Sequence, residues 1–127
     1  MTEPEGKKVI LCIDDNPSSL ITRQFVLASN GYGVASATNG KDGVRLAVAI
    51  NPDLVILDYR LPDLSGPEVA RAIKDYDPKV PILLFSGDSR SPEDLREYAD
   101  GFLAKDGGPT VLLGEIARLL LDKIPDE

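Results

Sequence analysis

The sequence contains no histidine and no tryptophan, and its single cysteine is Cys12. Without histidine, neither a Ser/His/Asp triad nor the usual zinc sites can form, and no phosphohistidine relay can run within the chain. Without a second cysteine no intrachain disulfide is possible, and the apolar run around Cys12 indicates a buried, inert thiol. Such a thiol fits a reducing cytosol, so we expect a cytoplasmic protein.

Long apolar runs are also missing. None approaches the roughly 20 residues of a membrane span, and the N-terminus from Met1 to Lys8 lacks the apolar segment of a signal peptide. Basic residues are in the minority, with 14 Lys and Arg against 21 Asp and Glu and a net charge of −7. An acidic surface disfavours direct binding to nucleic acid or to membranes, but it suits a divalent cation and basic partner surfaces.

The length and composition predict one globular domain. The chain has 127 residues, of which 43% are apolar, enough for one hydrophobic core. We expect a single domain over 1–127, with a flexible leader at 1–7 and a polar tail at 122–127.

Five short apolar runs alternate with segments of helical spacing. The runs cover 9–13, 33–37, 54–57, 82–85 and 102–104. Helices are expected from Pro17 to about 29, over about 41–50, from about 66 through 73, over a short segment 92–99 and from 109 through 120. In the first helix Ile21, Phe25 and Ala28 recur at helical spacing, as an apolar face would. Strict alternation predicts an α/β fold, with a five-stranded parallel sheet and five helices on both faces.

Residues suited to chemistry follow the predicted strands, at the edge where open parallel sheets bind ligands. The first strand leads into Asp14 and Asp15, the third into Asp58, the fourth into Ser86 and the fifth into Lys105. Three carboxylates at one edge repel one another, so positive charge must offset them. Lys105 supplies one charge and Mg²⁺ is suited to supply more. Between metal and ammonium, Asp58 would be a nucleophile toward a phosphoryl donor, with the Ser86 hydroxyl donating to a phosphoryl oxygen.

Each of these residues alone also has a purely structural interpretation. Asp14 and Asp15, with Asn16, can cap the first helix. Asp58 can be a turn residue, and Lys105 can form a surface ion pair. The order of acid pair, acid, hydroxyl and lysine at four strand ends favours the phosphoacceptor interpretation for the set.

At this point the sequence resembles the receiver domains of two-component response regulators, over about residues 7–121. The matching segments are VILCIDDN from Val9, ATNGKDG from Ala37, PDLVILD from Pro52, LPDLSG from Leu61, PILLFSG from Pro81 and GFLAK from Gly101. The resemblance implies a flavodoxin-like, doubly wound sheet of strand order 2-1-3-4-5. It also implies a stand-alone, chemotaxis-regulator-like signalling switch.

The resemblance further implies a phosphorylation site and a metal site. Asp58 would be the phosphoacceptor, and Lys105 would contact the phosphoryl group. Asp15, Asp58 and the main-chain carbonyl of Arg60 would ligate Mg²⁺, and Asp14 would help directly or through a water. The phosphoryl group would come from a sensor histidine kinase or a histidine phosphotransfer domain, and the domain would catalyse its own phosphorylation and dephosphorylation.

The resemblance implies a switch as well as a site. Ser86 would be the switch hydroxyl, and Phe102 the switch aromatic that turns inward when Ser86 moves. Arg60 and Asp88 stand at positions that tune phosphoryl lifetime in this family. Their opposite charges would pair across the site and slow autodephosphorylation, although two solvated side chains are the simpler interpretation.

Four features depart from the family pattern. Asp106 stands where the family usually has proline, so we expect a trans peptide between Lys105 and Asp106. The segment from Ser86 to Lys105 is short by about one helical turn, which predicts a stunted or displaced fourth helix and a reshaped output face. Gly87 loosens the loop after Ser86, and Phe102 lacks the hydroxyl of the more familiar tyrosine.

Three functions compete. The leading one is a phosphorylation-dependent switch without an output domain of its own, acting on an unknown downstream protein. The second is a phosphate-independent interaction module, a receiver that has lost its chemistry. A metal-dependent phosphatase or a flavin protein is disfavoured, because Asn16 stands where the phosphatase needs a second acid and Asp14-Asp15 would repel the flavin phosphate.

Overall fold

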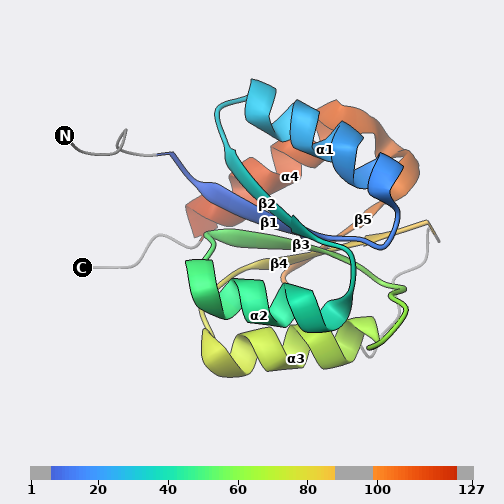
Figure 1. Ribbon diagram of the computed structural model, residues 1–127. Helices are drawn as coiled ribbons and strands as arrows, with labels where there is room; N and C mark the ends of the chain where they lie inside the picture. Colours follow the sequence, from blue (N-terminus) through green and yellow to red (C-terminus); the bar gives the residue numbers. More distant parts are fainter. Residues whose placement is uncertain (1–6, 88–98, 123–127) are drawn as a thin grey trace, which may run out of the picture.

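A computed structural model describes residues 7–87 and 99–122 of the chain (Figure 1). Its strands are β1 (Val9–Ile13), β2 (Gly33–Ala37), β3 (Leu54–Asp58), β4 (Ile82–Ser86) and β5 (Gly101–Ala104). Its helices are α1 (Pro17–Ser29), α2 (Gly40–Ile50), α3 (Gly66–Tyr76) and α4 (Gly108–Asp122), with a 3₁₀ turn, η2 (Lys105–Gly107), before α4. The predicted strands and all of these helices are therefore confirmed, with ends that agree within three residues.

The five strands form one sheet in the order β2-β1-β3-β4-β5, and every neighbouring pair is parallel. The predicted architecture and strand order are thus confirmed. The described residues contain four α-helices rather than five. The expected short helix at 92–99 lies outside the described residues except for Ala99, which is not helical, and α4 is the segment predicted as the fifth helix. Most of the expected leader and tail also lie outside the described residues.

Helices cover both faces of the sheet, α1 and α4 on one side and α2 and α3 on the other (Figure 1). Side chains alternate between the two faces along each strand. In β1, Leu11 and Ile13 pack in the core under α2 and α3, whereas Ile10 and Cys12 pack under α1 and α4. The central strands β3 and β4 are buried along their whole length. The continuous apolar runs of the sequence reflect this burial from two sides.

Helix caps set where the chain turns back from the site edge. The side chain of Asn16 accepts hydrogen bonds from the backbone N–H groups of Ser18 and Ser19, and Pro17 occupies the first turn of α1. Ser65 and Glu68 form a capping box at the start of α3. These caps satisfy N–H groups that have no partner within the helix.

Asp63, in the loop between β3 and α3, joins that loop to the start of α2. Its carboxylate accepts hydrogen bonds from the backbone N–H groups of Gly40 at 2.8 Å and Lys41 at 2.9 Å. These N–H groups lower the pKa of Asp63. The negative charge also lies at the positive end of the α2 dipole, which stabilises the junction.

The inward face of α1 differs from the expected one. Ile21 and Phe25 are 66% and 73% exposed, and the buried residues are Leu20, Arg23 and Leu27. Both sets have helical spacing, and the second contains Arg23, a residue type that is mostly exposed in proteins. The prediction was wrong because this arginine has an anionic partner inside the fold.

The peptide between Lys105 and Asp106 is trans, since the described backbone contains no cis peptide bond. This confirms the expectation drawn from the replacement of proline by Asp106. The chain continues directly from Lys105 into the η2 turn and then into α4.

Candidate functional site

The carboxylates of Asp14, Asp15 and Asp58 meet at the C-terminal edge of the sheet. Asp14 directly follows β1, and Asp58 is the last residue of β3, the neighbouring parallel strand. One carboxylate oxygen from each of the three residues lies within 4.8 Å of the others. The predicted convergence of the strand ends therefore exists in the fold, and we call these three residues the acid pocket.

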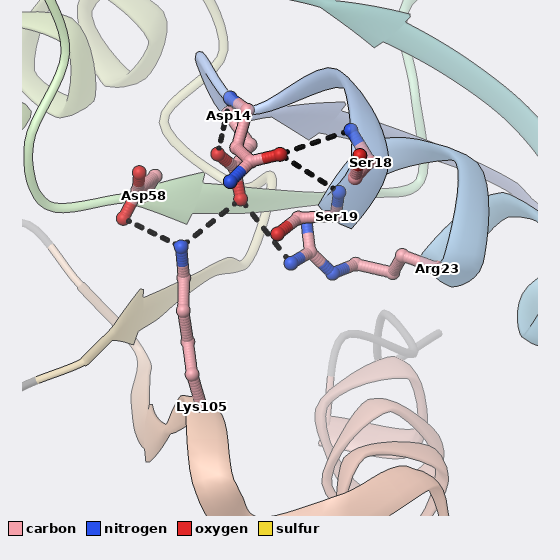
Figure 2. A network of polar contacts seen from close by, with 7 residues as sticks. Asp14, Ser18, Ser19, Arg23, Asp58 and Lys105 are labelled. Atoms are coloured by element: carbon pink, nitrogen blue, oxygen red, sulfur yellow. Dashed lines mark hydrogen bonds and ion pairs between the residues drawn. The ribbon is translucent and has the colours of Figure 1, made fainter.

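Lys105 reaches into the acid pocket from the end of β5 (Figure 2). Its Nζ lies 3.1 Å from Oδ2 of Asp14 and 3.4 Å from Oδ1 of Asp58. The ammonium thus bridges the two buried carboxylates, while Asp15 is exposed at the rim. Lys105 therefore offsets charge on the two buried carboxylates, and the exposed Asp15 marks the solvent side of the pocket.

Asp14 is held from both of its oxygens. Oδ1 accepts a hydrogen bond from the backbone N–H of Asn16 at 2.9 Å, and Oδ2 faces Lys105. Burial alone would raise the pKa of Asp14, but the Asn16 N–H and the Lys105 ammonium outweigh it, with help from Arg23. The pKa of Asp14 therefore lies below its ordinary value, and the group is ionised at neutral pH.

Asp58 has the opposite shift. Burial raises its pKa, and the negative charge of Asp14 raises it further, while Lys105 only partly offsets these effects. A buried carboxylate without full compensation is a site that favours binding of additional positive charge. A cation beside Asp58 would therefore stabilise its ionised carboxylate and lower its pKa.

Arg23 also belongs to the site, and it was not among the predicted residues. Its Nη2 lies 3.2 Å from Oδ2 of Asp14, and its guanidinium carbon lies 4.6 Å from the centre of the Phe85 ring. The side chain is almost fully buried. An arginine between two leucines of one helical stripe, Leu20 and Leu27, was the signal in the sequence that could have revealed it.

The remaining predicted residues differ in burial and position. Ser86 is buried at the end of β4 and is paired in register with Ala104 of β5. Phe102 is half-buried and packs against the core under α2 and α3. Arg60 is exposed in the loop after β3. Asp88 lies outside the described residues.

The donor set of the acid pocket fits a hard divalent cation. Three carboxylate oxygens at one edge match the oxygen ligands that Mg²⁺ takes, and an exposed rim leaves room for the waters it keeps. Cys12, the single cysteine of the chain, is buried in the core beneath α1, and burial raises its pKa to about 12. The donor set of the acid pocket therefore suits a metal with oxygen ligands better than one with sulfur ligands.

Comparison with known proteins identifies the family. Residues 10–117 match the sequence profile described as the response regulator receiver domain. The chain belongs to this family. The receiver domain of two-component response regulators is thus the unit in which the acid pocket occurs.

Individual relatives agree with this assignment. The receiver domain is 32% identical over 96% of its length to the probable transcriptional regulatory protein NarL of Mycobacterium tuberculosis, covering 57% of that protein. It is 34% identical over 82% of its length to the nitrate/nitrite response regulator protein NarL of Escherichia coli, covering 50% of it. The chain therefore spans about half the length of the curated relatives it matches.

Solved structures share the fold. A CheY-like receiver domain protein from Methanospirillum hungatei superposes with a TM-score of 0.87 and 26% identity, covering 93% of this chain and 97% of that one. Response regulator protein TrrA from Thermotoga maritima, solved in complex with Mg²⁺ and BeF, has a TM-score of 0.83 and 32% identity, covering 88% and 98%. Within the described residues of our chain, no helix is long and apolar enough to cross a membrane.

Proposed function

We propose that this receiver domain is a phosphorylation-dependent signalling switch that accepts a phosphoryl group on Asp58. The observation that carries the proposal is the position of Asp58. Its carboxylate lies at the end of β3, 3.4 Å from the Lys105 ammonium and within reach of the Asp14 and Asp15 carboxylates. A carboxylate in this setting is both a nucleophile and a metal ligand.

The residues of the acid pocket would hold Mg²⁺, with the main-chain carbonyl of Arg60 as a further ligand. When bound, the ion supplies positive charge for the phosphoryl oxygens. Asp14, Asp15 and Asp58 would bind and orient it from one edge of the sheet. The crystallised Mg²⁺ complex of the TrrA relative supports this assignment.

The transfer step forms one bond and breaks one. An oxygen of Asp58 attacks the phosphorus of a phosphohistidine on a sensor kinase or phosphotransfer domain, and the P–N bond breaks with its electron pair going to the imidazole. Lys105 moves its hydrogen bond from Asp58 to a phosphoryl oxygen, which its 3.4 Å approach makes a short displacement. Dephosphorylation is a separate hydrolysis: water attacks the phosphorus, the bond between phosphorus and the Asp58 oxygen breaks with its electron pair returning to the carboxylate, and phosphate leaves.

Ser86 and Phe102 would report the state of Asp58 to partners. Ser86 directly follows Phe85, the residue in register with Asp58, and this neighbouring strand-end position supports a role for its hydroxyl at the phosphoryl group. Phe102 shares the α2/α3 face with Leu84, its register partner on β4. A hydroxyl drawn toward the phosphoryl group leaves space into which the Phe102 ring turns, and a downstream protein would recognise that change.

The test is phosphorylation in vitro. We expect the protein to gain the mass of one phosphoryl group when incubated with Mg²⁺ and a small phosphodonor such as phosphoramidate, and to gain none with EDTA. Asp58→Asn should abolish the gain, whereas the matched control Asp75→Asn, on the exposed side of α3, should keep it. No gain in the unmutated protein would favour the phosphate-independent interaction module instead.

A further inference from the structure

Arg23 places a second cation against the carboxylate of Asp14, on the side away from Asp58. Its Nη2 lies 3.2 Å from Oδ2 of Asp14, the same oxygen that Lys105 contacts at 3.1 Å (Figure 2). With Oδ1 taken by the Asn16 N–H, both oxygens of Asp14 already have partners within the protein. Asp14 therefore meets a metal ion as a carboxylate with most of its acceptor capacity in use.

The environment of Arg23 keeps it in this position. The side chain is 6% exposed, and its guanidinium lies over the Phe85 ring at 4.6 Å. A buried guanidinium is costly to desolvate unless an anion and an aromatic face receive it, and here Asp14 and Phe85 do so. Because α1 and β4 fix both ends of the contact, Arg23 is a permanent part of the charge balance.

Arg23 changes the net charge of the acid pocket from the value that Lys105 alone would give. When its three carboxylates are ionised, the acid pocket with Lys105 and Arg23 keeps one uncompensated negative charge, and without Arg23 it would keep two. We propose that Arg23 is a positioning residue that holds Asp14 toward α1 and lowers the affinity of the pocket for Mg²⁺. This inference rests on the proposed function, because it concerns the metal that the pocket would use.

The experiment is a titration of metal-free protein with MgCl₂ in a calorimeter, at fixed ionic strength. Arg23→Met should bind Mg²⁺ roughly tenfold more tightly than the unmutated protein, the effect of one unit charge on a divalent ion in a half-open pocket. Arg23→Lys, which keeps the charge, should restore the original affinity. Arg45→Met removes the same charge from an exposed ion pair on α2, with 77% of the Arg45 side chain exposed, and should leave the affinity unchanged within about twofold.

The direction of the change separates positioning from mere support of the fold. If Arg23 only maintained the structure, its loss would distort Asp14 and weaken Mg²⁺ binding. Equal or weaker binding by a folded Arg23→Met, as judged by circular dichroism, overturns the inference. If that variant does not fold, Arg23→Gln makes the same comparison with a neutral side chain that still donates to Asp14.

The two proposals fail in different ways. Absence of Mg²⁺ binding by the unmutated protein contradicts the proposed function and the inference with it. Binding that is lost in Asp58→Asn but is the same with and without Arg23 contradicts the inference alone.

Discussion

Replacement of Asp58 by asparagine should stabilise the metal-free protein. Asp58 is buried between two carboxylates, and its raised pKa shows that the fold disfavours its ionised form. The carboxylate oxygens lie within 4.8 Å of one another, so at an effective dielectric constant of about 20 each carboxylate pair repels by about 3.5 kcal/mol, and Asp58 has two such neighbours. Lys105 at 3.4 Å contributes about 5 kcal/mol of attraction, which leaves about 2 kcal/mol of net repulsion.

Solvent around the exposed Asp15 weakens its repulsion of Asp58 and so reduces the net repulsion. We therefore expect Asp58→Asn to raise the free energy of unfolding by about 1 to 2 kcal/mol. The melting temperature should rise by about 3 to 8 °C. The assay is urea and thermal unfolding in EDTA at pH 7 and low salt. Asp75→Asn, an identical chemical change on the exposed side of α3, should shift neither value appreciably.

The pH dependence of stability is a second test of whether the ionised Asp58 destabilises the fold. Because the pKa of Asp58 is raised, its ionisation destabilises the folded protein as pH rises from the ordinary carboxyl pKa to the raised one. The difference between Asp58→Asn and the unmutated protein should therefore be largest at neutral pH and shrink as pH falls through this window. A metal-free Asp58→Asn protein that is less stable than the unmutated protein at pH 7 would refute the electrostatic reasoning.

Three other substitutions test the packing, the capping and the lifetime of the modified state. Gly43→Ala should lower the free energy of unfolding, measured in urea, by about 1 to 3 kcal/mol, because its Cβ would lie 2.5 Å from Cδ1 of Ile13. An unchanged urea midpoint would show that the Ile13 side chain shifts to make room at no cost. Ser65→Ala should cost about 1 kcal/mol by removing the capping box of α3, and Ser65→Asp should recover most of it in the same assay. Arg60→Ala should shorten the phosphoryl half-life severalfold, followed by mass spectrometry after removal of the donor, and an unchanged half-life contradicts the lifetime role of Arg60.

Much of the site could be predicted because it depends on strand order. Continuous apolar runs predict parallel strands buried on both faces, and parallel strands end at a common edge. Asp14 and Asp58, 44 residues apart in the chain, could therefore be placed together without coordinates. The trans peptide before Asp106 could likewise be predicted, since only proline makes a cis peptide inexpensive.

The parts that could not be predicted depend on contacts between elements. Helical spacing in α1 fits two stripes, and only the tertiary contact of Arg23 with Asp14 decides that its stripe faces inward. Local sequence does not show that a charged residue has a buried partner nine residues away. The exposure of Ile21 and Phe25 follows from the same contact.

The most direct test of the central proposal locates the phosphoryl group on the chain. The protein is phosphorylated with Mg²⁺ and phosphoramidate, treated with borohydride, which reduces an acyl phosphate to an alcohol, and digested for peptide sequencing by mass spectrometry. We predict homoserine in place of Asp58 and unchanged Asp14 and Asp15. Reduction at another carboxylate, or none in the phosphodonor-treated protein, would contradict the assignment of Asp58 as the phosphoacceptor.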